Sequence, residues 1–217
     1  MSEYSVARTH MIDGQLRPNE VNDERVIDAI GAVPREAFVP KTKRDVAYVD
    51  EDIAVGEGRY LIEPMIFGRM LVAANIQPSD LVLDIGCATG YSSAVLAHLA
   101  DAVVALEENE TLADAAEKKL TDLEIMNAAV VKGALGSGVS RQGPYDVIFM
   151  GGAVEDVPMT VVRQLKEGGR LICVKTVNGV GRGHMITMRD GIPAGRDLFN
   201  ANVAKIPGFE QPKGFEF

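Results

Sequence analysis

The chain has 217 residues, of which 47% are hydrophobic and 24% charged, a composition typical of one globular domain. This balance excludes a protein that is disordered over its whole length. The formal net charge of −9, from 31 acidic and 22 basic residues, argues against a nucleic-acid-binding protein, because phosphate binding needs clustered Lys and Arg.

The first part of the chain has a helical pattern that prolines interrupt. In residues 22–33 the apolar side chains recur at helical spacing behind Asn22, which is a candidate helix cap. Residues 64–76 form a second apolar run that begins at Pro64, and proline is favoured in the first turn of a helix. These two runs predict helices.

From residue 80 onward, short apolar runs alternate with helical segments. The predicted strands are residues 81–85, 102–107, 127–133, 145–152 and 169–176. The predicted helices are residues 91–100, 111–123 and 159–169. Strands that alternate with helices form a parallel sheet with right-handed crossovers. Asn109 is the candidate cap of the second of these helices.

The end of the last parallel strand is followed by a different pattern. Asn178-Gly179 is typical of a hairpin turn, and residues 184–190 come too soon afterwards for a crossover helix. An antiparallel strand is therefore expected to close one edge of the sheet. The predicted fold class is α/β, a doubly wound, mostly parallel sheet with an antiparallel edge strand and an N-terminal helical extension.

No linker or low-complexity tract divides the chain. We predict a single domain, 1–217, in which a helical extension, 1–75, packs on an α/β core, 76–217. The N-terminus lacks the apolar core of a signal peptide, and no apolar run is long enough to cross a membrane. The two cysteines and three histidines suit neither a disulfide framework nor a zinc site. We therefore expect a cytoplasmic protein with no metal and no membrane partner.

The segment from Val82 to Tyr91 carries the most informative pattern. The first strand meets its helix here, and open α/β sheets bind ligands at this edge. Gly86 and Gly90 allow a tight turn and the close approach of a ligand to the backbone. Asp84 places a carboxylate beneath the loop, where it can organise the loop or meet a cationic group such as a methionine amine.

Glu107 ends the second strand, about 20 residues after the loop, where it can accept hydrogen bonds from both hydroxyls of a ribose. Dinucleotide-binding loops have the spacing G-x-G-x-x-G around a pyrophosphate. The spacing G-x-A-x-G found here favours a ligand without phosphates, S-adenosylmethionine, and hence a Rossmann-like class I methyltransferase. A dehydrogenase is the competing enzyme class, but none of the five tyrosines begins the Tyr-x-x-x-Lys pattern of short-chain reductases.

The chain also resembles the protein-L-isoaspartate O-methyltransferase family over roughly residues 8 to 190. The resemblance is carried by QLRP (15–18), DERVIDAI (23–30), VPREAFVP (33–40), AYVDED (47–52), VLDIGCATGYSSAVLAHLA (82–100), PYDVI (144–148) and QLKEGGRL (164–171). It implies methylation of the α-carboxylate of isoaspartyl residues in damaged proteins and peptides by S-adenosylmethionine. It places Asp84, Gly86, Gly90, Tyr91 and Glu107 at cofactor-binding positions. The predicted cofactor set further includes Ile62, Cys87, Ala88, Glu108, Ala134 and Leu135.

Two positions depart from the family pattern. The family has T-I-S-x-P before the helix that starts at Pro64, and Ile62 stands where its Ser or Thr hydroxyl belongs. The family's G-D-G after the third strand is Gly133-Ala134-Leu135, so that Ala134 replaces an Asp directed at the adenine amine. Two alternatives therefore stay open beside the isoaspartyl enzyme: a methyltransferase for another acceptor, and a catalytically weak cofactor-binding paralogue.

Tyr60 and Glu63 are the candidate catalytic residues. In an extended segment, Tyr60 and Ile62 point to the same side, so that the Tyr60 hydroxyl could orient the acceptor, which is a protein, a peptide or a small molecule. Glu63 would repel an anionic acceptor and could act as a general base toward a neutral or cationic one. The structural alternatives are simple packing for Tyr60 and a solvated charge at a helix start for Glu63.

Overall fold

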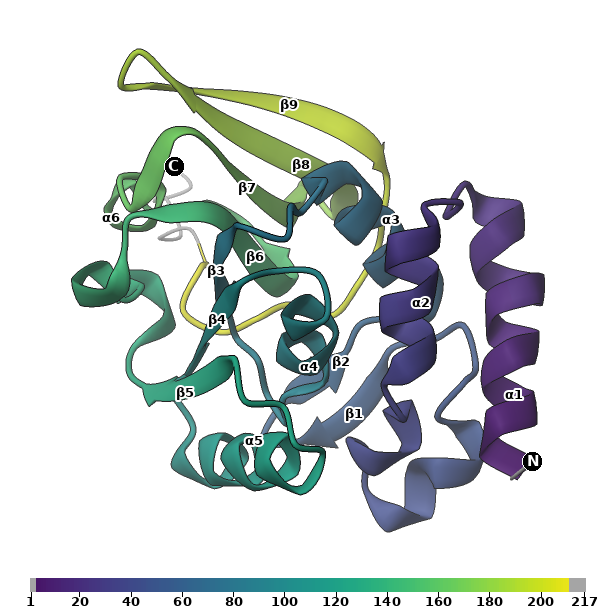
Figure 1. Cartoon of the computed structure of the whole chain (residues 1–217). Helices are drawn as coiled ribbons and strands as arrows, with labels where there is room; N and C mark the ends of the chain where they lie inside the picture. The colour runs from purple at the N-terminus through teal and green to yellow at the C-terminus, as the bar shows by residue number, and fades with distance from the viewer. Residues whose placement is uncertain (1–2, 211–217) are drawn as a thin grey trace, which may run out of the picture.

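The structure is a computed structural model that describes residues 3–210. Its central sheet consists of β3 (Leu81–Ile85), β4 (Ala102–Glu107), β5 (Ala128–Lys132), β6 (Tyr145–Val154), β7 (Leu165–Val177), β8 (Val180–Arg189) and β9 (Ile192–Asn200). The strand order is β5-β4-β3-β6-β7-β8-β9 (Figure 1). Strands β3 to β7 pair in parallel, whereas β8 and β9 are antiparallel. The prediction of a doubly wound, mostly parallel sheet is confirmed.

The parallel strands are apolar on both faces, which explains their unbroken hydrophobic runs. Val82 and Val147 belong to one core cluster, and their neighbours Leu83 and Ile148 belong to a second. Helices cover the two faces. The first cluster lies beneath α3 (Pro64–Ala74), α4 (Tyr91–Ala97) and α5 (Glu110–Asp122), and the second beneath α6 (Met159–Val162) and the segment that follows β9.

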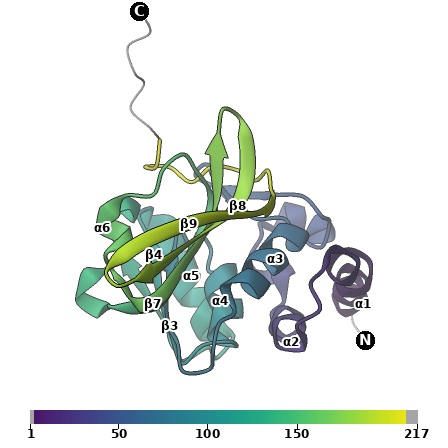
Figure 2. The same cartoon turned by 90° about the horizontal axis from the view of Figure 1, so that it is seen from above.

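The part of the N-terminal extension that precedes α3 packs outside α3 and α4. It comprises α1 (Glu3–Met11), α2 (Glu24–Ala32), several short helical turns, and a hairpin of β1 (Ile53–Gly56) and β2 (Arg59–Leu61). Helix α2 contacts α3 and α4, and α1 lies farther from the sheet (Figure 2). The hairpin was not predicted, and it carries a residue of the candidate site. No helix in residues 3–210 is long and apolar enough to cross a membrane.

Two of the predicted helix caps and one start position can be compared with the structure. Asn109 caps α5 by accepting a hydrogen bond from the Leu112 N–H at 3.0 Å, as predicted. Pro64 occupies the first turn of α3, also as predicted. The cap of α2 is Asp23 rather than Asn22, because the Asp23 carboxylate accepts a hydrogen bond from the Arg25 N–H.

The predicted helix at residues 159–169 is largely wrong. Helix α6 ends at Val162, and β7 already begins at Leu165. The cause is pairing with β6: Leu165 lies opposite Tyr145, whose N–H donates to the Gln164 carbonyl at 2.8 Å. Sheet pairing thus overrides the local helical pattern. The predicted antiparallel edge is present, but it contains two strands, since β9 follows β8 and takes the outermost place.

Candidate functional site

The loop between β3 and α4 turns sharply at the carboxyl end of the parallel strands. Gly86 has φ +79° and Gly90 has φ +94°, values in the left-handed region that favours glycine. The Gly86 N–H donates to the Leu106 carbonyl at 2.9 Å, and the Gly90 N–H donates to the Cys87 carbonyl at 2.8 Å. A Cβ atom at Gly90 would lie 3.1 Å from the Ala116 Cβ. The predicted turn is therefore present, and α5 packs closely against it.

Asp84 is fully buried beneath this loop. Its Oδ2 accepts hydrogen bonds from the hydroxyls of Ser92 and Ser93, each at 2.6 Å. Its Oδ1 is buried and has no hydrogen-bond partner within residues 3–210. Burial raises the pKa of Asp84 to about 6. A buried carboxylate oxygen without a donor is unfavourable, so this atom suits a ligand that brings a cationic N–H group.

Glu107 is also completely buried. Its Oε2 accepts a hydrogen bond from the Ala88 N–H at 2.8 Å. Its Oε1 accepts from the N–H groups of Glu108 and Asn109 at 3.0 and 3.1 Å, and from Arg59 Nη1 at 3.0 Å. A carboxylate offers about four acceptor positions. Oε1 already accepts three hydrogen bonds and Oε2 accepts one, so a ribose could bond to both oxygens only by displacing a donor from Oε1.

Arg59 is the unexpected member of the site. It lies on β2 and is only 3% exposed. Besides its ion pair with Glu107, it donates from Nη2 to the Gly86 carbonyl at 2.8 Å. A side chain at Gly86 would overlap the Arg59 guanidinium. The sequence did not predict Arg59 as a site residue, because arginines are mostly exposed. The feature of the sequence that lies closest to Arg59 is the departure from the family pattern at Ile62.

Little free volume remains beside the loop. The cavity there measures about 20 Å³, enough for about one water molecule and far below the roughly 300–1,000 Å³ of typical ligand pockets. The predicted residues that line it are Tyr60, Ile62, Gly86, Cys87, Ala88 and Tyr91. The structure therefore brings these six together, and Arg59 lies against one of them, Gly86.

The two candidate catalytic residues lie in different places. Tyr60 is 40% exposed and Ile62 is 6% exposed, yet both line the small cavity. Glu63 instead lines a separate, open cleft beside Val180 and Arg182. Burial, followed by the nearby carboxylates of Asp50, Asp52 and Glu51, raises the pKa of Glu63 to about 7. The charge of Glu63 is thus sensitive to pH, but Glu63 does not line the small cavity beside the Gly86–Gly90 loop.

A second buried arginine supports the wall of the cavity. Arg35 is 1% exposed and donates to the Ile62 carbonyl at 2.7 Å and to the Ala47 carbonyl at 2.8 Å. Its guanidinium lies 4.8 Å from the centre of the Tyr91 ring. Tyr91 in turn packs against Phe38, with 5.6 Å between ring centres. Arg35 therefore fixes both the segment after β2 and the aromatic ring at the start of α4.

The remaining predicted cofactor residues lie outside the cavity. Ala134 and Glu108 are exposed, and Leu135 is buried in the second hydrophobic cluster. The Gly133 N–H donates to the Glu107 carbonyl at 3.1 Å, which holds this loop beside the end of β4. The thiol of Cys87 is buried, and burial raises its pKa well above the ordinary value, so Cys87 is not an activated nucleophile.

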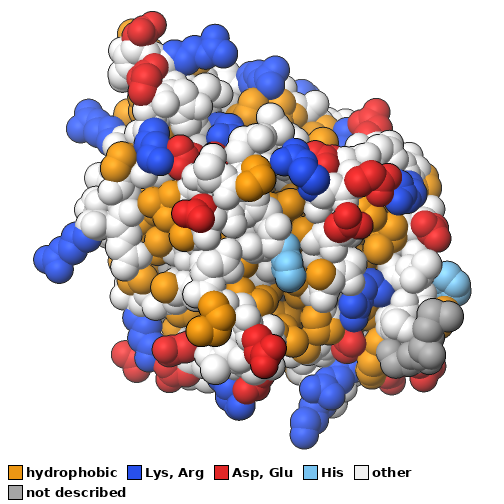
Figure 3. Space-filling view, in the orientation of Figure 1, with side chains coloured by type: hydrophobic (Ala, Val, Ile, Leu, Met, Phe, Trp, Pro, Cys, Tyr) orange, Lys and Arg blue, Asp and Glu red, His pale blue; other side chains and the backbone are white. Residues whose placement is uncertain are grey.

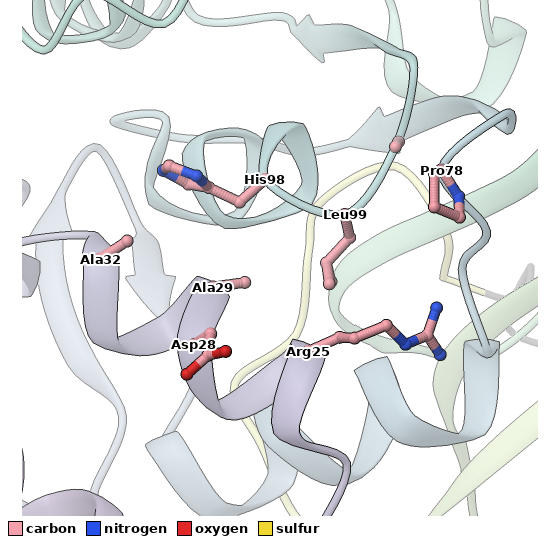
Figure 4. Close-up of a pocket in the computed structure, with 8 residues that line it drawn as sticks. Arg25, Asp28, Ala29, Ala32, Pro78, His98 and Leu99 are labelled. Carbon is pink, nitrogen blue, oxygen red and sulfur yellow. The ribbon is translucent and has the colours of Figure 1, made fainter.

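Another cleft of the described residues has a charged group that is already paired. A cleft of about 420 Å³ lies between α2 and the segments at Pro78 and His98 (Figure 4). Its Arg25 is already held by the Ile76 carbonyl and by Asp23. No group of three His, Cys, Asp or Glu side chains within residues 3–210 is placed to hold a metal ion. Acidic and basic side chains are interspersed on the face drawn in Figure 3.

Comparisons with known proteins agree on one family. The family described as Protein-L-isoaspartate(D-aspartate) O-methyltransferase (PCMT) matches residues 7–185. A protein-L-isoaspartate O-methyltransferase from Koribacter versatilis is 39% identical over 172 residues, which make up 79% of this chain and 78% of that protein. Another from Methanoculleus marisnigri is 37% identical over 165 residues, 76% of this chain and 75% of that protein.

Solved structures show the same fold. A protein-L-isoaspartate O-methyltransferase superposes with a TM-score of 0.80 and 25% identity, over 93% of this chain and 66% of that chain. A Plasmodium falciparum protein described as a protein-L-isoaspartate O-methyltransferase, in complex with S-adenosyl-L-homocysteine, superposes with a TM-score of 0.78 and 17% identity. That match covers 94% of this chain and 98% of the other.

Proposed function

The chain belongs to the protein-L-isoaspartate(D-aspartate) O-methyltransferase family, and on this premise we propose that it methylates isoaspartyl carboxylates of proteins or peptides with S-adenosylmethionine. The main support within the molecule is the Gly86–Gly90 loop, which is flanked by two buried carboxylates at the ends of adjacent strands. Its relatives from Koribacter versatilis and Methanoculleus marisnigri carry the same activity in their names.

The residues present fit the two ends of this cofactor differently. The unpartnered Oδ1 of Asp84 suits the ammonium group of the methionine end. Glu107 suits the ribose hydroxyls, and its Oε1 becomes available to one of them once Arg59 has left it. We assign the adenine end to the loop of Ala134 and Leu135, which Gly133 holds beside Glu107. When bound, S-adenosylmethionine supplies a methyl group on a positively charged sulfur.

The acceptor needs positioning more than it needs a base. An isoaspartyl carboxylate is already ionised near pH 7, and holding two reactants in the right geometry supplies a large part of the acceleration. Tyr60 is partly exposed at the rim of the cavity, so we assign its hydroxyl to orienting the acceptor. Ile62 forms an apolar part of the same wall. Glu63 faces another cleft, which removes the support for a general base at this position.

The proposed function is tested by methyl transfer to an isoaspartyl peptide, with the aspartyl peptide of the same sequence as the control. We expect transfer to the isoaspartyl peptide alone. Ile62→Ser should increase that activity, because it provides a second hydroxyl in the cavity. Tyr60→Phe should lower the activity by about tenfold, since a misplaced reactant can lower a rate by up to about 100-fold. Full activity of Tyr60→Phe would remove Tyr60 from the mechanism. Cofactor binding without transfer, even in Ile62→Ser, would point to a different acceptor.

Cofactor affinity is expected to depend on pH through Asp84. Burial raises the pKa of this carboxyl to about 6, and only the ionised form attracts an ammonium group. The affinity for S-adenosylmethionine should therefore be constant above about pH 7 and fall by up to about tenfold per unit below pH 6. Calorimetric titrations at several pH values measure this slope. Asp84→Asn should bind more weakly and lose the slope; a slope that persists in Asp84→Asn would assign the titration to another group.

We also place the protein in the cytoplasm and take its partner to be a protein or peptide substrate. The support for the location is that Cys87 and Cys173 are both free and buried, as is usual in a reducing compartment. The negative net charge supports the absence of a nucleic-acid partner.

A further inference from the structure

We propose that Arg59 is a competitor of the cofactor built into the chain, and that S-adenosylmethionine binds only when the Arg59 guanidinium leaves Glu107. This inference rests on the proposed function, since it concerns the cofactor site of that reaction. It adds a switch to the site: Arg59 holds the site closed, and the cofactor displaces it.

The first argument is the hydrogen bonding of Glu107. Three of its four donors are backbone N–H groups, from Ala88, Glu108 and Asn109. These groups belong to the loop and to the end of β4, and they cannot leave without unfolding both. The fourth donor is the Arg59 side chain, which can rotate away. A ribose hydroxyl that bonds to Oε1, which also accepts from Glu108 and Asn109, must therefore take the place of Arg59.

The second argument is space and charge. The Nη2 atom of Arg59 lies 2.8 Å from the Gly86 carbonyl, directly over the glycine that would contact a ligand. The cavity that remains holds about one water molecule. The cofactor carries a positive charge on sulfur, so a guanidinium left in the same buried space would also repel it. Arg59 and the cofactor cannot occupy the site together.

The third argument is that the hairpin allows Arg59 to move. Strand β2 is three residues long, and its pairing with β1 shifts register between Ala54 and Gly56. In the turn, Gly56 and Gly58 have positive φ angles, and Cβ atoms placed on them would meet nothing within 4 Å. The turn next to Arg59 is therefore open on its outer side. The short strand and its open turn are therefore the part of the chain that we expect to move when Arg59 leaves Glu107.

The expected consequence is a lowered apparent affinity. A ligand that binds only the open state has an apparent dissociation constant equal to the intrinsic one divided by the open fraction. Arg59→Ala removes the closed state and should tighten the binding of S-adenosylmethionine by about tenfold or more. Arg59→Lys, with a shorter reach and one charged nitrogen, should lie between wild type and Arg59→Ala. The control Arg17→Ala removes an exposed arginine that is paired with Glu24, and it should bind like wild type.

The experiment is calorimetric titration of these four proteins with S-adenosylmethionine, together with the shift of the melting temperature that the ligand causes. We expect the largest shift in Arg59→Ala. Ethylguanidinium at millimolar concentration should fill the space left in Arg59→Ala and weaken cofactor binding there, but not in wild type; ethylammonium should act more weakly. This weakening by ethylguanidinium is not expected if Arg59 has a purely structural role. If Arg59→Ala does not fold, Arg59→Lys carries the same comparison.

The outcomes separate the inference from the proposed function. Equal affinity of wild type, Arg59→Lys and Arg59→Ala, with measurable binding in all three, would overturn the competitor and leave the methyltransferase intact. Weaker binding in Arg59→Ala would assign Arg59 to the cofactor's binding contacts and also overturn the competitor. Absence of binding in every variant would overturn the proposed function and the inference with it. Tighter binding that ethylguanidinium reverses supports both.

Discussion

Glu107→Gln is expected to lower the free energy of unfolding by about 3–5 kcal/mol, as is typical when one partner of a buried ion pair is removed. The substitution keeps the size of the side chain but leaves the buried Arg59 guanidinium without a counter-charge. It also replaces one carboxylate oxygen, which accepts hydrogen bonds from backbone N–H groups, by an NH₂ group, which can only donate. Urea denaturation of wild type and variant measures the difference. The neighbouring Glu108 is exposed, so Glu108→Gln is the matched control and should unfold like wild type.

A double-mutant cycle identifies the cause of this loss. Adding Arg59→Met to Glu107→Gln should restore part of the lost stability, because the unpaired buried charge is then gone. If the two substitutions simply add, the loss in Glu107→Gln comes from the loop N–H groups, and the ion pair is not the dominant interaction.

Arg35→Met is expected to lower the free energy of unfolding by about 3–5 kcal/mol. The reason is that the carbonyls of Ala47 and Ile62 lose their buried donor, at about 1–3 kcal/mol each, while the stacking on Tyr91 is also lost. Methionine fills most of the space, which limits the effect of a cavity. Denaturation by urea again measures the difference.

The control for this prediction is Arg17→Met. Arg17 is exposed and pairs at the surface with Glu24, and such pairs contribute little, so the variant should unfold like wild type. An Arg35→Met protein that also unfolds like wild type would show that the two carbonyls find water, and that Arg35 does not support the cavity wall. Reduced cofactor affinity at unchanged stability would instead indicate that Arg35 acts through the position of Ile62.

The two buried arginines explain why this site differs from an open cofactor pocket. Arg35 holds the backbone after β2 in place through the Ile62 carbonyl. Arg59, three residues before Ile62, pairs with Glu107. The hairpin therefore presents Ile62 and Tyr60 to the cavity, while it places Arg59 against the loop.

Features that depend on near neighbours in the chain could be predicted from the sequence alone. The Asn109 cap reaches Leu112, three residues away, and Asn178-Gly179 forms its hairpin turn with φ angles of 50° and 78°. The parallel strands follow from unbroken apolar runs, because such strands are buried on both faces. The glycine loop and the strand-end carboxylates follow from spacing along one β-α-β unit.

Which polar groups meet inside the molecule depends on the folded chain and could not be predicted from local patterns. Arg59 and Glu107 are 48 residues apart, and Arg35 and Ile62 are 27 residues apart, so no local pattern links them. The same holds for residues 165–169, whose helical pattern gave way to pairing with β6. Burial of a charge is unfavourable unless a partner from elsewhere in the fold meets it, and the position of that partner exists only once the chain has folded.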